Sequence, residues 1–215
     1  MTDKIFTEID KFDKWAQSQF DEPQDEVAGE WECNYENWNE IYLAFEKLMT
    51  HTHPNDLTDK QKDRLLYIIA RDNETEYLSS ILNDDFLLLL TEHSIIDGKK
   101  NDKWQLAIQL YRLVDRQKAL QLLENFVDDD DEYVNRRALM ELARVNSDKV
   151  EFYAQKFWNK NKYGEMEEYQ KMAVLQSLSL INSKIIDSYI NLALQSGQKN
   201  LTEFAKKLQS ERNNY

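Results

Sequence analysis

The segment from Asp131 to Gly197 contains the same pattern twice, and this repeat limits the possible folds more than any other feature of the chain. Residues 131–147 align with residues 167–183 after a shift of 36 positions. The identical pairs are Glu132/Glu168, Tyr133/Tyr169, Leu139/Leu175, Leu142/Leu178, Asn146/Asn182 and Ser147/Ser183. The matched apolar positions fall on one stripe of a helix, and each copy continues into a second amphipathic segment. A two-helix unit repeated at this length predicts an α-solenoid, because one unit cannot bury its apolar face alone.

The start of the first copy carries a resemblance to a known family. Residues 131–142, DEYVNRRALMEL, resemble the first helix of a HEAT repeat, where an acidic start leads to a Val-Arg pair and a seam of small and Leu residues. The Arg position of that motif is Asn135 in one copy and Lys171 in the other, and the usual Pro is missing from both. The resemblance implies an all-α fold, a right-handed α-solenoid of stacked antiparallel helical hairpins. Its clearest copies are residues 131–164 and 167–197.

Helix breakers are scarce in the rest of the chain, which extends the helical prediction to all of it. The sequence has four Gly and two Pro, and both Pro lie near the front. Residues 3–20, 35–49 and 58–83 show helical periodicity, and Thr58 with Gln61 predicts a capping box. We expect residues 1–57 to form acidic, aromatic-rich helices and a loop that cap the stack. Residues 58–215 would then form the HEAT-like repeats.

Two segments between these regions are also predicted to be helical. Residues 84–97 contain the most apolar run of the chain, Phe86 to Leu90, which predicts a buried helix. Residues 102–127 predict a hairpin that is a third, weaker copy of the repeat. Its first apolar stripe runs from Trp104 to Val114.

The net charge of −13 is concentrated at the front of the chain. Residues 1–57 hold 14 acidic and 4 basic side chains, whereas the other 158 residues hold 26 and 23. This distribution argues against nucleic-acid binding, which needs Lys and Arg to replace the counterions of the phosphates. It favours a basic protein partner that is attracted by long-range electrostatics.

Two groups of acidic and aromatic residues predict where such a partner would bind. Tyr and Trp are typical anchors of protein interfaces, and carboxylates select a cationic patch. The same residues are also compatible with a plain structural role, in which the aromatic side chains belong to the core and the second acidic run opens a helix. The predicted partner-binding residues are Asp21, Glu22, Asp25, Glu26, Glu30, Trp31, Glu32, Tyr35, Trp38, Asp128, Asp129, Asp130 and Asp131.

Signals for chemistry are weak throughout the sequence. Cys33 is the only cysteine, and His51 and His53 lack further ligands at zinc-binding spacing, so we expect neither a metal site nor a cofactor. No phosphate-binding Gly loop is present. HEAT-like DNA glycosylases need a basic groove, and HEAT-like iron hydroxylases carry His-Glu pairs, and neither feature occurs in this chain. The start of the chain does not resemble a signal peptide and no run is long enough to span a membrane, which predicts a cytoplasmic protein.

These observations favour a protein that binds another protein and performs no chemistry of its own. The most concrete version is an immunity protein that neutralises a basic toxin such as a nuclease. A generic scaffold or assembly adaptor that uses the concave face of the solenoid is the alternative. A HEAT-like enzyme is a third hypothesis, which would require a cleft with strongly perturbed ionisable groups.

Overall fold

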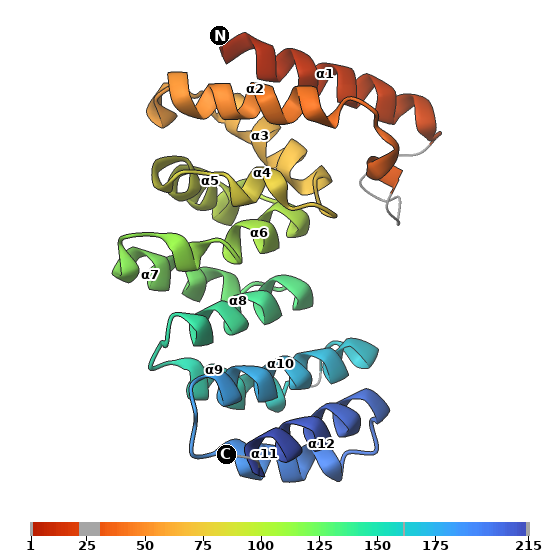
Figure 1. Cartoon of the computed structure of the whole chain (residues 1–215), viewed down its shortest axis with the longest axis vertical. Coiled ribbons are helices and arrows are strands. Elements are labelled where there is room, and N and C mark those ends of the chain that lie inside the picture. Colours follow the sequence, from red (N-terminus) through yellow and green to blue (C-terminus); the bar gives the residue numbers. More distant parts are fainter. Residues whose placement is uncertain (1, 22–30, 161, 214–215) are drawn as a thin grey trace. The chain divides into compact units, whose positions relative to one another are not determined.

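The computed structural model describes residues 2–21, 31–160 and 162–213, and this part of the chain is all-helical, without a strand. The all-α prediction is therefore confirmed. The chain forms two compact units, Met1–Gln109 (unit 1) and Leu110–Tyr215 (unit 2) (Figure 1). Unit 1 contains α1 (Thr2–Gln19), η2 (Trp31–Asn34), α2 (Trp38–His51), η3 (Pro54–Asp56), α3 (Asp59–Arg71), α4 (Tyr77–Ser80), α5 (Asp84–Asp97) and α6 (Lys100–Ala107). Unit 2 contains η4 (Leu110–Arg112), α7 (Arg116–Val127), α8 (Glu132–Arg144), α9 (Val150–Trp158), η5 (Gly164–Met166), α10 (Glu167–Leu180), α11 (Ile186–Leu194) and α12 (Lys199–Asn213).

In unit 1, the N-terminal helices α1 and α2 pack together with the helices that follow them. Helix α1 packs against α2 and α3, and α3 also contacts α5 and α6. Its core contains the fully buried Phe12, Phe45, Leu65, Ile68 and Ile69. Helices α1 and α2 therefore belong to the same compact unit as α3 to α6, which ends at Gln109.

The start of α3 shows how the local sequence fixes one of these helices. The Thr58 hydroxyl accepts a hydrogen bond from the Gln61 backbone N–H at 3.3 Å, and the Gln61 side-chain oxygen accepts one from the Thr58 N–H at 2.9 Å. The Gln61 N–H also donates to the Thr58 carbonyl oxygen at 2.9 Å, so the first turn of α3 is held by both backbone and side-chain hydrogen bonds. The capping box expected from the sequence is therefore confirmed.

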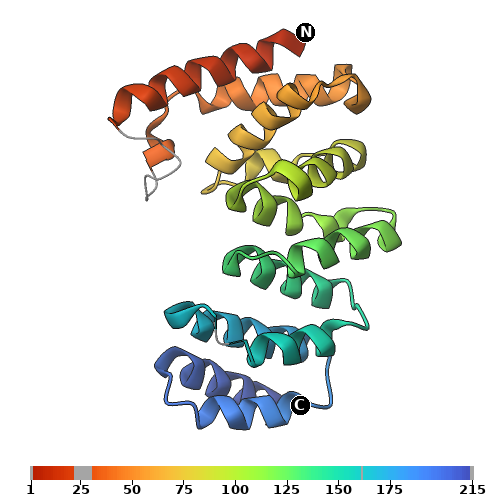
Figure 2. The same cartoon turned by 180° about the vertical axis from the view of Figure 1, so that it is seen from behind.

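The helices of unit 2 lie in two rows. Helices α8, α10 and α12 form the first row, in which α10 packs against both of the others (Figures 1 and 2). Helices α7, α9 and α11 form the second row, and side-chain contacts join its neighbouring members. Lys149 of α9's N-terminal cap pairs with Glu124 of α7 at 2.7 Å, and the rings of Trp158 and Tyr189 meet edge to face at 5.0 Å between centroids.

The turns after α8 and α10 have the same backbone conformation, and they contain the identical Asn-Ser pairs of the two aligned copies. Asn146 and Asn182 both take left-handed conformations, with φ of 55° and 50°. The next residue in each turn, Ser147 or Ser183, donates its backbone N–H to a carbonyl five residues earlier at 2.9 Å. This pattern is a Schellman motif, which satisfies the last carbonyls of a helix. The identical Asn-Ser pairs therefore mark equivalent helix ends 36 residues apart.

Two expectations about burial are wrong. Val114 is 89% exposed, because α6 ends at Ala107 and the chain leaves the helical register before Asp115 caps α7. Helix α5 has the predicted bounds, but it is buried on one face only. Its residue Ile96 is 78% exposed.

Candidate protein-binding surfaces

The aromatic residues predicted as anchors lie in a cluster inside unit 1. Trp31 stacks on Trp15 at 5.8 Å between ring centroids, while Tyr35 and Trp38 lie 5.1 and 5.2 Å from Phe12. Tyr35 is buried, and Trp31 and Trp38 are half-buried. These contacts give the three side chains a role in holding η2 and α2 against α1. A contact with a partner stays a prediction for the exposed edges of the two Trp rings.

The predicted binding residue Glu32 is engaged inside the same cluster. Its Oε1 lies 3.3 Å from Nη1 of Arg71, and both side chains are more than nine-tenths buried. The guanidinium group of Arg71 also lies over the rings of Trp31 and Tyr67, at 5.5 and 5.3 Å from their centroids. Burial raises the pKa of the Glu32 carboxyl, and Arg71 opposes this shift. Since separating the pair would leave a buried charge, Glu32 has a structural role.

The other carboxylates predicted at the front of the chain divide into two groups. Asp21 is exposed at the end of α1. Glu22, Asp25, Glu26 and Glu30 lie outside the described residues, so their binding role stays a prediction.

The second acidic run, in unit 2, contributes to the start of α8. The Asp131 carboxylate accepts hydrogen bonds from the backbone N–H groups of Tyr133 and Val134 at 2.9 and 3.1 Å. Asp129 accepts one from the Asp131 N–H at 2.9 Å. Of the two interpretations of this run, the structure shows the helix cap directly.

The two remaining residues of the run form ion pairs on the surface. Asp128 pairs with Lys156 of α9, and Asp130 pairs with Lys162 at 2.7 Å. The Lys162 ammonium lowers the pKa of the Asp130 carboxyl. All four side chains are largely exposed, so these pairs contribute little to stability. They nevertheless reduce the negative potential that the run would otherwise present to a partner.

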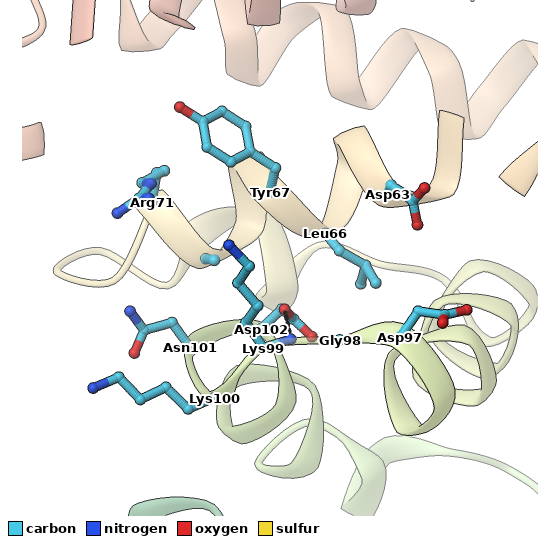
Figure 3. A pocket seen from close by; sticks show the side chains of 11 residues that line it. Asp63, Leu66, Tyr67, Arg71, Asp97, Gly98, Lys99, Lys100, Asn101 and Asp102 are labelled. Carbon is cyan, nitrogen blue, oxygen red and sulfur yellow. Dashed lines mark hydrogen bonds between the residues drawn. The ribbon is translucent and has the colours of Figure 1, made fainter. Parts of the chain in front are cut away.

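A pocket of about 340 Å³ lies in unit 1 between α3 and the turn that joins α5 to α6. Figure 3 shows Arg71, Lys99, Lys100 and Asn101 around one part of it and Asp63 and Asp97 around another. Its other lining residues are Leu66, Tyr67, Ala70, Gly98 and Asp102. The volume is at the lower end of the range for ligand pockets, and the mixed charges leave no single sign of ligand preferred.

The α5–α6 turn that forms this pocket depends on Gly98. A Cβ atom at this position would lie 2.5 Å from the carbonyl oxygen of Ser94. Because Gly98 has no side chain, the Asp102 carboxylate can lie against this turn. It accepts one hydrogen bond from the Ser94 hydroxyl and another from the Lys99 backbone N–H at 2.8 Å. Burial raises the pKa of the Asp102 carboxyl to about 6. The sequence gives no direct signal for this pocket, because Gly98 lies between two periodic segments as an ordinary helix break would.

The histidines and the cysteine occupy separate positions. His53 accepts a hydrogen bond from the Asn55 N–H at 3.2 Å at the start of η3, and His93 lies 2.7 Å from Asp63. Cys33 is exposed. Within the described ranges, no group of three or more His, Cys, Asp or Glu side chains could hold a metal ion.

The outward face of α5 combines apolar and acidic side chains. Leu88 and Leu89 are half-buried, Ile96 is largely exposed, and Asp85 and Glu92 are exposed at helical spacing beside them. Together with η3, this face borders a groove of about 220 Å³. The sequence contained the signal for this surface, because residues 84–97 are apolar at more positions than one helical stripe can bury.

The division into two units also divides the charge. Residues 1–109 contain 24 acidic and 11 basic side chains, which give the whole net charge of −13, whereas residues 110–215 contain 16 of each. The excess negative charge is therefore a property of unit 1.

No protein-family model matches the chain, and no curated protein or solved structure shows significant similarity to it. Within the described part of the chain, no helix is both long and apolar enough to cross a membrane.

Proposed function

We propose that this chain is a protein-binding module without chemistry of its own, and that unit 1 binds a basic protein. The observation that carries the proposal is the charge division, since unit 1 holds the entire net charge of −13 and unit 2 is neutral. Excess charge of one sign raises the association rate with an oppositely charged partner and suppresses wrong partners. The most concrete version is an immunity protein that neutralises a basic toxin, such as a nuclease, in the cytoplasm.

The proposal includes a scaffold of HEAT-like hairpins stacked into a right-handed solenoid. Two features of unit 2 support it: the two rows of helices and the equivalent turns at Asn146 and Asn182. A stack of this kind holds its helices at fixed spacing, so an attached binding surface loses little conformational entropy on association.

A scaffold that uses the first row of helices is the second candidate function. A groove of about 280 Å³ between α8 and α10 favours it. Three repeat-related pairs line this groove: Met140/Gln176, Glu141/Ser177 and Arg144/Leu180. Leu180 is 56% exposed, and Arg144 lies over the ring of Tyr111, 3.2 Å from its centroid. Arg and Tyr are enriched among the residues that contribute most to binding at protein interfaces.

Partner capture followed by calorimetry tests the first proposal. The full chain is used to isolate its partner from the native cells, and the recombinant partner is then titrated at rising salt. We expect a basic partner whose affinity falls by about tenfold or more between low and physiological ionic strength. A partner with balanced charge, or affinity that is indifferent to salt, contradicts the proposal.

Charge-reversal variants distinguish the two candidate functions. Asp21, Glu36 and Asp85 are exposed acidic residues of unit 1, and their joint replacement by Lys should weaken binding.

The matched control replaces Asp148, Glu165 and Glu203, which are exposed acidic residues of unit 2. This variant changes the net charge by the same amount. If it weakens binding as much as the unit 1 variant, the interaction responds only to total charge. If only substitutions in the α8–α10 groove weaken binding, the scaffold hypothesis is favoured.

A further inference from the structure

Helix α5 exposes apolar surface that the fold of unit 1 does not use. Phe86, Leu87 and Leu90 point inward and are fully or almost fully buried. The opposite face carries Leu88, Leu89 and Ile96, of which Ile96 is 78% exposed. The solvent-facing side of a surface helix is normally polar. The outward stripe therefore calls for a partner outside the unit.

Two acidic side chains lie among these apolar positions on the same outward face of α5. Asp85, Leu88 and Glu92 are spaced by three and four residues, and so lie in one row along α5. Leu89 and Ile96 belong to the same outward face. Residues His53, Pro54 and Asn55, before and within η3, form the other wall of the groove.

We propose that this groove is the docking site for an amphipathic helix of the basic partner, with Lys or Arg next to its apolar anchors. This inference rests on the proposed function and names the surface and the kind of segment that it takes. Residues 85–96 span about 17 Å along the helix axis, which matches an occupant of about three turns. Helices that lie in such grooves use apolar anchors at three- and four-residue spacing.

The charge of unit 1 decides between possible occupants. The groove lies in a unit with a net charge of −13, and Asp85 and Glu92 are among the residues that line it. An acidic peptide, a nucleic acid or an anionic lipid surface would be repelled by this field. A basic helix gains both the apolar contact and the electrostatic attraction.

Fluorescence anisotropy with a defined probe tests the site. The probe is a labelled peptide of about 14 residues, built from Leu and Lys with the leucines at helical spacing. A second peptide of the same composition has its leucines in alternating order, so it carries equal charge without an apolar helical stripe. We expect the full chain to bind the first peptide at least about tenfold more tightly than the second.

Substitutions on α5 locate the binding surface. The double variant Leu88→Ser and Ile96→Ser keeps every charge and changes exposed or half-buried positions, so the fold should persist, which circular dichroism checks. We expect it to lose about tenfold in affinity for the helical peptide. The matched controls Leu43→Ser and Val114→Ser remove apolar side chains that are 49% and 89% exposed elsewhere, and should change affinity by less than about twofold.

The outcomes separate failure of the site from failure of the proposed function. Equal affinity for both peptides, no binding of either, or an unchanged α5 double variant overturns the docking site. If the captured basic partner still binds the double variant with full, salt-dependent affinity, the proposed function stands and only the site is wrong. If the captured partner is not basic, the proposed function fails as well.

Discussion

The paired turns of unit 2 lead to the sharpest prediction about stability. Asn146 and Asn182 hold left-handed conformations, with φ of 55° and 50°. This region costs about 1–2 kcal/mol for a residue with a Cβ atom, and Asn tolerates it better than Ala does. Each single Asn→Ala variant should therefore lose about 1 kcal/mol of unfolding free energy. The two losses should agree within about 0.5 kcal/mol, because both turns form the same hydrogen bonds.

Glycine at either position is the matched control. It takes the left-handed conformation without steric cost, but it loses more conformational entropy on folding. We expect Asn146→Gly and Asn182→Gly to stay within about 0.5 kcal/mol of the natural protein. Urea unfolding followed by circular dichroism measures the free energies. Hydrogen exchange at the amides of Ser147 and Ser183 then locates each loss at its own turn.

Two results would refute this reasoning. If Gly is as damaging as Ala, the Asn side chain matters and the backbone conformation does not. If Ala costs unfolding free energy at one turn and nothing at the other, the two turns are not energetically equivalent, in spite of their shared sequence and geometry.

Two further predictions concern buried groups. Gly98→Ala should lower the unfolding free energy of unit 1 by about 1–3 kcal/mol, because the added Cβ would meet the Ser94 carbonyl oxygen. A urea midpoint equal to that of the natural protein would contradict this prediction. Burial raises the pKa of the Glu141 carboxyl to about 7, so the folded state binds this proton more tightly than the unfolded state. The unfolding free energy should therefore fall by roughly 3 kcal/mol as pH rises from about 4 through 7. Glu141→Gln should flatten that part of the profile of unfolding free energy against pH, and a variant with the natural pH dependence would contradict the assignment.

Local signals in the sequence predicted local structure well. The Thr58–Gln61 capping box and the Asn-Ser turns depend on neighbouring residues, so the sequence pattern contains all of the interacting groups. The bounds of α5 follow from Asn83, which accepts the Phe86 N–H at 3.0 Å, and from the break at Gly98.

Pairs of residues that are far apart in the sequence could not be predicted in the same way. Glu32 was predicted to face a partner because nothing in residues 21–46 shows that Arg71, which lies 39 positions later, pairs with it. Asp128 and Asp130 were likewise predicted as binding residues, and their pairing with Lys156 and Lys162 depends on how α9 and the following turn pack. Composition shows that charge is present, but only the fold shows which charges neutralise one another.

The acidic excess of unit 1 supports the proposed basic partner. Internal pairing occupies Glu32 and the acidic run of unit 2, yet unit 1 still has 13 more acidic than basic residues. Folding does not require such an excess, because unit 2 forms a similar number of helices with balanced charge, and like charges destabilise a compact state. Under the proposed function, this excess serves to attract a basic partner. The outward face of α5 lies in the same unit, so the proposed basic partner would meet both the acidic excess and the exposed apolar surface.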